Sequence, residues 1–427
     1  MQKLPYAVIG AGPSGLSAAR ALQKAGLSFI GYEKHADVGG LWDIKNPHST
    51  MYQTAHLISS KKMTEYSEFP MKDSIADYPS HRELFEYFQD YANHFKLKEH
   101  FKFNAEVQSI TRDADGNWDV TANGETIKFA GIILATGTLH YPNLPESKGD
   151  YTGESFHSGM YKSPDVFKGK DVLIVGCGNS ACDIAIDAIH HSKSVDISVR
   201  RGYHFVPKYI FGKPADTVGG LKIPTMIQLN IQKKILKAFM GSPENFGFPK
   251  PDHDLFESHP VVNSLILYHA GHGDIGVKPD IKKIEEKKVF FIDGREKEYD
   301  LILWATGYKL KYPFIDKSFL NWKTGAIPDM YLKIFHPELD NVFIVGMIEA
   351  LGLGWQGRYE QAALVASYIK QREIKSPSYV KFNSLKKNVL DLSGGIKYIK
   401  LDRMSYYVHK KTYLGELSKH QNILASV

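Results

Sequence analysis

The chain has 427 residues, which is enough for two or three domains at about 150 residues each. Hydrophobic residues make up 43% and charged residues 23%, an ordinary globular composition that argues against wholesale disorder. The longest apolar runs are far shorter than the ~18–20 residues needed to cross a bilayer, so no membrane span is expected.

The net charge of +6 is a mild excess that suits an anionic cofactor, and the sequence has no dense basic stripe typical of nucleic-acid binding. The two cysteines, Cys177 and Cys182, can form neither a disulfide framework nor a CxxC redox pair. The first strand-like run begins at Pro5, which leaves no room for a signal peptide. We therefore expect a cytoplasmic protein with no nucleic-acid partner and no metal site.

The first recognisable element is a dinucleotide-binding turn. Residues 6–15 read YAVIGAGPSG, a buried-strand run followed by a glycine-rich turn, and a helical pattern continues from Leu16 to Lys24. The G-x-G-x-x-G spacing lets the first glycine make the turn, the second approach a pyrophosphate and the third pack helix against strand. The predicted binding residues of this turn are Gly10, Gly12, Pro13, Ser14 and Gly15.

A second copy of this pattern begins at Val172, where the chain reads VLIVGCGNSA and continues as a helix from Cys182 to His190. Its last fingerprint position is alanine, which the fingerprint allows. In both copies the phosphates would sit at a helix N-terminus, where free N–H groups and the helix dipole favour anions. The predicted binding residues of the second turn are Gly176, Gly178, Asn179, Ser180 and Ala181.

The residues that end the next strand-like run differ in charge between the two copies. Glu33 follows the first turn, whereas Arg200 and Arg201 follow the second at a similar offset of about 20 residues. A carboxylate accepts hydrogen bonds from ribose hydroxyls but repels a 2′-phosphate, so Glu33 favours FAD or NAD. An arginine suits the 2′-phosphate, so the second unit favours NADP. A solvated strand end is the simpler alternative for the arginine pair.

Two strand-like runs, GIILATG at 131–137 and DLILWATGY at 300–308, echo each other. They indicate that the chain leaves one nucleotide domain, passes through the other and returns. We predict an α/β fold of two Rossmann-like domains, with the NADP domain inserted into the FAD domain. The predicted parts are residues 1–150 for FAD, 151–300 for NADP with an irregular, partly helical subdomain at about 207–273, and 301–427 for the FAD return and a C-terminal extension.

Two electron carriers on one chain imply hydride transfer between them, with NADPH reducing the flavin. A disulfide reductase would need a CxxC close to the flavin, which this sequence lacks. The residues alone leave a carrier protein, a quinone or oxygen as the next acceptor.

At this point the sequence resembles the flavin-containing monooxygenases, within the class B flavoprotein monooxygenases. GAGPSG, YEK and GGLW (39–42) resemble the family's FAD site, and GCGNSACDIA with VRRG resembles its NADP site. The family fingerprint F-x-G-x-x-x-H-x-x-x-(F/Y) is matched by Tyr151, Gly153, His157 and Tyr161, with Tyr in place of the first Phe. SKKMTEYSEFP (60–70) and ATGY (305–308) are also family-like, and the resemblance runs from about Tyr6 to about Ile369.

The resemblance implies an FAD- and NADPH-dependent monooxygenase. Oxygen would add at flavin C4a to give a (hydro)peroxyflavin, which inserts one oxygen atom into a soft nucleophile of a small molecule, an amine nitrogen or a sulfide sulfur. Water must be kept out because it releases peroxide from this intermediate. The further FAD residues we assign are Lys34, Gly40, Leu41, Trp42, Val107, Thr136 and Gln356, and the further NADP residues are Tyr52, Ala305 and Thr306. Core packing is the alternative for Leu41 and Trp42, and an equal one for Val107.

Two of these assignments carry specific expectations. Gln356 lies in a glycine-rich loop that enters a helix, whose N-terminus could stabilise negative charge at flavin N1–O2. A simple helix cap is the alternative for Gln356. His157 could be mistaken for a base, but the resemblance places its motif on the link between domains, so we expect a structural or hinge role.

One departure from the family bears on catalysis. The family usually has an Asn beside flavin C4a in a segment like S-N-x-x-K, and alignment on Lys61 puts Ile58 at that position. Isoleucine cannot form hydrogen bonds through its side chain, so another polar group is expected to compensate. His56 is our first candidate for that catalytic role, and Ser59 and Ser60 are the others.

The missing Asn leaves the substrate class open. Relatives without it include enzymes that perform Baeyer–Villiger oxygenation of ketones, which makes that reaction the first alternative. The Baeyer–Villiger signature ends in Trp, whereas this chain has Tyr161, so heteroatom oxygenation stays first. An NADPH oxidase or flavin reductase is the second alternative, and a non-catalytic nucleotide sensor is disfavoured because both cofactor sites are kept. The oligomeric state stays open, with a homodimer as one option.

Overall fold

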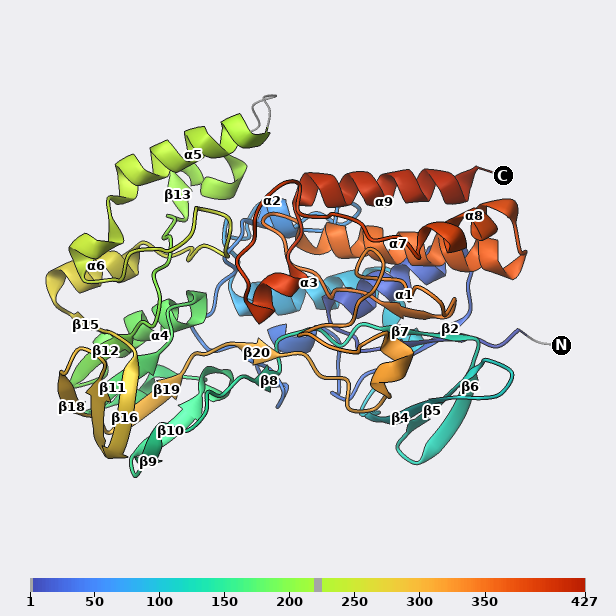
Figure 1. Ribbon diagram of the computed structural model, residues 1–427. Coiled ribbons are helices and arrows are strands. Elements are labelled where there is room, and N and C mark those ends of the chain that lie inside the picture. The colour runs from blue at the N-terminus through green and yellow to red at the C-terminus, as the bar shows by residue number, and fades with distance from the viewer. Residues whose placement is uncertain (1–2, 219–224, 427) are drawn as a thin grey trace.

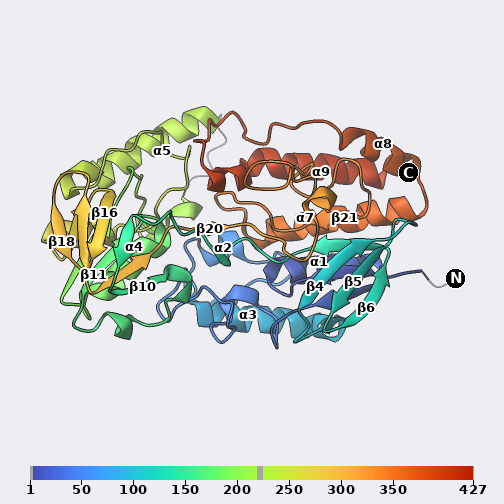
Figure 2. The same cartoon turned by 60° about the horizontal axis from the view of Figure 1, so that its bottom comes forward.

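The computed structural model describes residues 3–218 and 225–426 of the chain. The described residues form two halves that lie side by side, each built on a five-stranded sheet (Figures 1 and 2). The short strands β8 (Tyr141–Pro142) and β20 (Tyr308–Lys309) pair antiparallel in the region where the two halves meet.

The first sheet is parallel throughout, with the strand order β21-β7-β1-β2-β3. Its central strands read YAVI and GIIL, and every residue in them is buried. Such continuous apolar runs are expected where both faces of a parallel sheet are covered. The strands are β1 (Tyr6–Ile9), β2 (Phe29–Tyr32), β3 (Phe101–Lys102), β7 (Gly131–Leu134) and β21 (Val342–Ile344).

Alternate residues of β1 point to two different cores. Tyr6 and Val8 pack with the helices on one face, and Ala7 and Ile9 pack with a three-stranded antiparallel sheet on the other. The helices of the first half are α1 (Pro13–Ala25), α2 (Lys61–Thr64), α3 (His81–His94), α7 (Gly354–Glu373), α8 (Pro377–Leu385) and α9 (Lys410–Ala425). The antiparallel strands are β4 (Val107–Arg112), β5 (Trp118–Ala122) and β6 (Glu125–Phe129).

The second half repeats this plan with the parallel strand order β10-β19-β11-β12-β15. Val172 and Ile174 pack with α4 (Asn179–Ile189) and α6 (Leu265–His272), whereas Leu173 packs with the antiparallel strands on the opposite face. The parallel strands are β10 (Glu154–His157), β11 (Asp171–Val175), β12 (Ser194–Ser198), β15 (Ile275–Lys278) and β19 (Leu301–Trp304). The other sheet comprises β9 (Gly149–Tyr151), β16 (Ile281–Glu286), β17 (Lys288–Phe291) and β18 (Glu296–Glu298).

These strands correct one boundary of the sequence analysis. Residues 301–304, which we assigned to the returning FAD part, form β19 inside the second sheet between β10 and β11. The chain therefore returns to the first half only after Trp304, because β19 pairs in parallel with both of its neighbours.

The region at about 207–273 contains a short hairpin, α5 (Thr225–Met240) and α6. The hairpin strands are β13 (Tyr209–Ile210) and β14 (Lys213–Pro214). Within the described ranges, no helix is both long enough and apolar enough to cross a membrane. The 3-10 turns are Gly40–Trp42, Leu97–His100, Ser158–Met160, Pro164–Phe167, Ala215–Thr217, Pro243–Phe246, Lys317–Leu320 and Asp402–Tyr406.

Candidate active site

A cavity of about 1070 Å³ opens between the two halves and is lined by residues from both. We call it the central cleft. Residues that directly follow β1, β7, β11 and β19 line it, which is where open parallel sheets bind their ligands. Its volume lies at the upper end of the roughly 300–1,000 Å³ typical of ligand pockets.

The two glycine turns have the same geometry. Gly10 has φ +103° and Gly176 has φ +117°, a region that side-chain-bearing residues rarely adopt. A Cβ atom on Gly10 would lie 2.8 Å from the carbonyl oxygen of Ala135, and one on Gly176 would lie 2.5 Å from that of Ala305. Each turn therefore packs against the ATG segment of its own half, which explains why that segment occurs twice.

Both turns present an open helix N-terminus to the cleft. Helices α1 and α4 begin directly after Gly12 and Gly178, and in the described structure neither has a side-chain cap or an acidic residue in its first turn. A Cβ atom on Gly178 would meet no described atom within 4 Å, and one on Gly12 would meet only the Gly40 Cα at 3.6 Å. Unpaired N–H groups with free space in front of them suit a pyrophosphate. Gly15 has the packing role, because its Cβ would lie 1.8 Å from the Gly10 carbonyl oxygen.

The charged residues at the two strand ends differ in whether other protein groups already bind them. Glu33 is buried in the cleft wall, where its two oxygens accept hydrogen bonds from the backbone N–H groups of Ala11 (2.7 Å) and His35 (2.9 Å). Arg200 lines the cleft and has no hydrogen-bond or ion-pair partner among the described residues. Arg201 instead lies outside the lining and pairs with Asp252 at 2.8 Å. The arginine pair of the sequence thus supplies one cation to the cleft.

Most of the other residues that we assigned to FAD line the cleft. Thr136 carries the clearest sign of a missing partner, because its buried Oγ1 has no hydrogen bond within the described structure. Buried hydroxyl groups are normally satisfied, so this one fits a bound ligand. Trp42 lies edge-to-face with Trp355 at a ring distance of 6.2 Å. The lining includes Pro13, Ser14, Lys34, Gly40, Leu41, Trp42 and Val107.

Gln356 is placed differently from our expectation. Its side chain accepts a hydrogen bond from the Ser67 N–H at 2.9 Å and donates one to Glu360 at 2.6 Å, in a second, smaller cavity. Trp355 and Arg358, three residues apart on the same helix face, line the central cleft instead. The helix N-terminus therefore does reach the cleft, but Gln356 points away from it.

Sequence reasoning missed Arg358. Its guanidinium group donates to the carbonyl oxygens of Gly354 (2.8 Å) and Ile348 (3.4 Å). Burial lowers the pKa of this guanidinium, and the charge of Glu349 opposes the shift. Among the described residues no carboxylate hydrogen-bonds to it. The positive charge of Arg358, in a poorly solvated wall, is therefore available to a ligand bound in the cleft.

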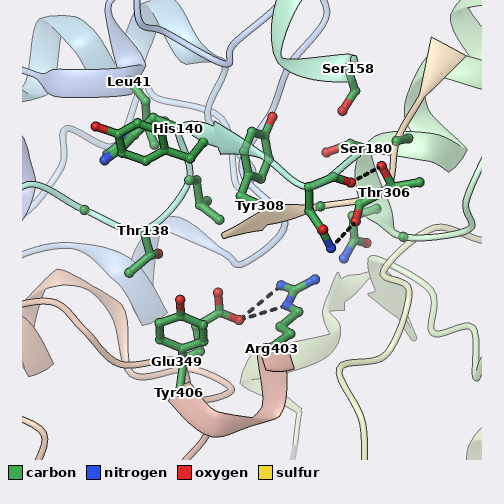
Figure 3. A pocket seen from close by; sticks show the side chains of 18 of the residues that line it. Leu41, Thr138, His140, Ser158, Ser180, Thr306, Tyr308, Glu349, Arg403 and Tyr406 are labelled. Atoms are coloured by element: carbon green, nitrogen blue, oxygen red, sulfur yellow. Dashed lines mark hydrogen bonds and ion pairs between the residues drawn. The ribbon is translucent and has the colours of Figure 1, made fainter. Parts of the chain in front are cut away.

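The residues that we assigned to NADP also line the cleft. Thr306 donates from Oγ1 to the Asn143 carbonyl oxygen at 2.6 Å, which ties the second ATG segment to the loop after the first (Figure 3). Asn179 accepts a hydrogen bond from the Val262 N–H at 2.7 Å. The lining includes Tyr52, Gly176, Gly178, Asn179, Ser180, Ala181, Ala305 and Thr306.

The segment around Ile58, which stands at the position of the family Asn, lies partly inside and partly outside the cleft lining. His56 and Ile58 line the cleft, whereas Ser59 turns its Oγ to Thr64 Oγ1 at 2.8 Å, outside the lining. Ser60 is also outside, buried beneath a contact in which its N–H donates to Asp216 at 2.7 Å. Of these three polar residues, His56 is the one in the lining; its side chain is exposed, and its Nδ1 lies 2.8 Å from the Thr54 carbonyl oxygen.

The fingerprint residues lie behind the cleft wall and hold it in place. His157 Nε2 is 3.0 Å from the Gly307 carbonyl oxygen, and burial lowers the pKa of this imidazole, so the neutral ring donates to that carbonyl. Tyr161 donates to Asp187 of α4 at 2.9 Å. Tyr151 donates to the Tyr299 carbonyl at 2.9 Å, beside Gly153. These contacts fit the structural role that we expected for His157.

The C-terminal part of the chain also reaches the cleft, which no sequence motif indicated. Lys400, Arg403 and Tyr406 belong to the lining, and Arg403 donates to Glu349 from Nε (3.2 Å) and Nη2 (3.1 Å) (Figure 3).

His140 lines the cleft as well, and burial lowers the pKa of its imidazole to about 4, so that it is neutral near pH 7.

Comparison with known proteins gives a consistent set of relatives. The family described as flavin-binding monooxygenase-like matches residues 3–420. The chain is 32% identical over 385 residues to Flavin-containing monooxygenase 5 of Homo sapiens, covering 82% of this chain and 70% of the human protein. It is 30% identical over 438 residues to Flavin-containing monooxygenase 3 of Oryctolagus cuniculus, covering 96% of this chain and 82% of the rabbit protein. An open crystal structure of cyclohexanone monooxygenase has the same fold, with a TM-score of 0.71 at 18% identity over 100% of this chain and 98% of that one.

Proposed function

The chain belongs to the flavin-containing monooxygenase family, and we propose that it inserts one oxygen atom from O2 into an amine nitrogen or a sulfide sulfur of a small molecule. It is an oxidoreductase that depends on FAD and NADPH, as this family is. The substrate class is the part that we infer.

One observation supports the dependence on two dinucleotide cofactors. Two glycine turns of the same geometry, each backed by an ATG segment and each opening a helix, face one cleft from opposite halves. The residues that would read the ribose groups, Glu33 and Arg200, differ in charge as FAD and NADPH require.

The residues present fit both cofactors. FAD would be held by the Gly10–Gly12 turn, by Glu33 at its ribose and by the unpartnered hydroxyl of Thr136. NADPH would be held by the second turn and by Arg200. When bound, the two cofactors supply hydride transfer and the activation of oxygen, and the protein supplies position, charge and the exclusion of water.

Particular side chains supply the positive charge near FAD and the exclusion of water. The guanidinium of Arg358 and the first turn of α7 place positive charge in the FAD half of the cleft, where it would stabilise an anionic cofactor. Leu41, Trp42 and Ile58 give an apolar wall, and such a wall limits the access of water to a reactive intermediate.

Two features bear on the substrate class in opposite directions. Tyr161, where the Baeyer–Villiger signature has Trp, favours oxygenation of nitrogen or sulfur. Ile58, in the cleft at the position of the family Asn, favours ketone oxygenation as the second candidate. We place heteroatom oxygenation first because Tyr161 departs from the Baeyer–Villiger signature.

The test is product analysis with labelled oxygen. The purified holoenzyme is supplied with NADPH, ¹⁸O2 and, in turn, a thioether, a tertiary amine and a cyclic ketone. One ¹⁸O atom in a sulfoxide or N-oxide, with close to one NADPH consumed per product, supports the proposal. Label found only in a lactone moves the assignment to ketones. NADPH consumption that yields only hydrogen peroxide for all three substrates overturns a monooxygenase role in favour of an oxidase.

The same assay tests His56. We expect His56→Ala to lower the ratio of oxygenated product to NADPH, because His56 is the polar side chain of its segment in the cleft. Ser59→Ala is the matched control, since its hydroxyl is bonded to Thr64 outside the lining. An unchanged ratio in His56→Ala would remove His56 from the proposal.

A further inference from the structure

The C-terminal segment 399–408 spans the central cleft from one half to the other. At one end the Ile399 N–H donates to the Glu257 carbonyl oxygen at 3.0 Å. At the other end the backbone of Glu349 donates to the Tyr406 carbonyl and accepts from the Val408 N–H, both at 3.0 Å. The segment therefore forms part of the cleft wall and is fixed to both halves by backbone hydrogen bonds.

The loop that receives this segment adjoins the second glycine turn. The side chain of His259 bonds to the hydroxyl of Tyr407. Three residues on, the Val262 N–H donates to the side chain of Asn179, the first residue of α4. Val261 pairs with Phe205, shortly after Arg200 in the chain. The C-terminal segment is thus carried next to the residues that would bind NADPH.

Two cations of this segment, Lys400 and Arg403, line the cleft, and Arg403 is the one with an ion-pair partner there (Figure 3). Its Nε and Nη2 both donate to the same oxygen of Glu349, and Nη1 has no partner among the described residues. Its side chain is 49% exposed although it lines the cavity. One edge of the guanidinium is therefore held, and the rest is open to a ligand.

Arg403 and Arg200 share a neighbour, Tyr203, which also lines the cleft. Burial raises the pKa of the Tyr203 phenol, and the charges of Arg201, Arg200 and Arg403 act against that rise.

We propose that Arg403 binds a phosphate group of NADPH, so that the C-terminal segment completes a cofactor site begun by the second nucleotide domain. A guanidinium with free N–H donors suits phosphate oxygens, and such a charge-assisted contact is stronger than a neutral one. Glu349 acts as a positioning residue that holds Arg403 at the edge of the cleft. The proposal rests on the use of NADPH by this enzyme.

The experiment measures the binding of NADP⁺ and NAD⁺ to the oxidised FAD holoenzyme by calorimetry. We expect Arg403→Gln to weaken NADP⁺ binding by about tenfold or more. Weakened NADP⁺ binding with unchanged NAD⁺ binding assigns the contact to the 2′-phosphate, and equal weakening of both assigns it to the pyrophosphate. Lys397→Gln is the matched control, because Lys397 is an exposed cation of the same region outside the lining.

Two further variants separate phosphate binding from a structural role. Arg403→Lys keeps the charge and is expected to recover most of the NADP⁺ affinity. Glu349→Gln keeps an acceptor oxygen that can hold Arg403 and removes the competing negative charge, so NADP⁺ should bind as tightly as to the wild type or more tightly. If Glu349→Gln and Arg403→Gln weaken binding alike, the ion pair only anchors the segment and the proposal is wrong. Unchanged NADP⁺ affinity in Arg403→Gln also overturns it, whereas a wild-type enzyme that binds no NADP⁺ would refute the NADPH dependence itself.

Discussion

Replacing Gly178 by alanine should separate cofactor binding from folding. Gly178 has φ −82° and extended backbone, which any L-residue adopts, and its added Cβ would meet no described atom within 4 Å. The protein itself therefore tolerates the methyl group. The open space lies where the helix N-terminus faces the cleft, so the methyl group would meet the pyrophosphate of NADP.

This geometry gives the expected changes in folding stability and in the free energy of NADP⁺ binding. For folding, a Gly→Ala change at a compatible site is worth about 0.4–1 kcal/mol of added stability. For binding, a methyl group forced into a filled site costs about 1–3 kcal/mol. With tenfold per 1.4 kcal/mol, this corresponds to about 5–150-fold weaker binding of NADP⁺.

Gly176→Ala is the matched variant with the opposite outcome. Its Cβ would lie 2.5 Å from the Ala305 carbonyl oxygen, at φ +117°. Overpacking at about 1–3 kcal/mol and backbone strain at about 1–3 kcal/mol both act on folding. We therefore expect a clear loss of thermal stability in Gly176→Ala and none in Gly178→Ala.

The assay combines calorimetric NADP⁺ binding with the thermal midpoint and the FAD content of each purified variant. FAD content should be unchanged in Gly178→Ala, because the first turn lies in the other half. The reasoning is refuted if Gly178→Ala binds NADP⁺ like the wild type, or if it melts as early as Gly176→Ala.

Three further outcomes are expected. Arg200→Gln should raise KM for NADPH far more than for NADH, because it removes a charge-assisted contact worth about 1.5–3 kcal/mol. Arg201→Gln, which loses its contacts with Asp252 and His253 outside the lining, should not, and equal effects of Arg200→Gln on both cofactors would contradict a 2′-phosphate role. Arg358→Gln should weaken FAD binding about tenfold in titrations of apoprotein, since it removes a half-buried cation that lines the FAD half of the cleft, and unchanged affinity would exclude that role. Burial lowers the pKa of Lys386 from 10.5 to about 8, so between these pH values the unfolded chain binds more protons than the folded one. The free energy of unfolding should therefore rise with pH in this range, by at most about 1.4 kcal/mol per pH unit. Thermal midpoints at pH 7.5 and 9.5 should show this rise relative to Lys386→Met, and identical pH profiles of the two proteins would refute it.

Local patterns accounted for the parts of the site that depend on local geometry. The spacing of Gly10, Gly12 and Gly15 predicts a tight turn that leads into an open helix N-terminus. The same holds for the turn at Gly176. Their distance from the glycine turns shows that Glu33 and Arg200 end the next strand of a βαβ unit, where a charged residue can contact the ribose. For this reason the α/β fold and the need for two dinucleotides could be predicted from the sequence.

Residues whose direction depends on distant neighbours were predicted less well. Gln356 and Arg358 lie on one helix, and only its packing against Ser67 and the cleft decides which of them faces the cofactor side. Arg200 and Arg201 are adjacent in the sequence, but Asp252, far along the chain, takes one of them.

The sequence by itself determined which cofactors this protein can hold, because short glycine turns and single charged strand ends carry that information within about 25 residues. Only the tertiary structure decided what else surrounds them. The ion pair of Arg403 with Glu349 and the bond of His259 to Tyr407 form between segments far apart in the chain. No spacing rule can anticipate such contacts, since they depend on how the C-terminal segment packs across both halves.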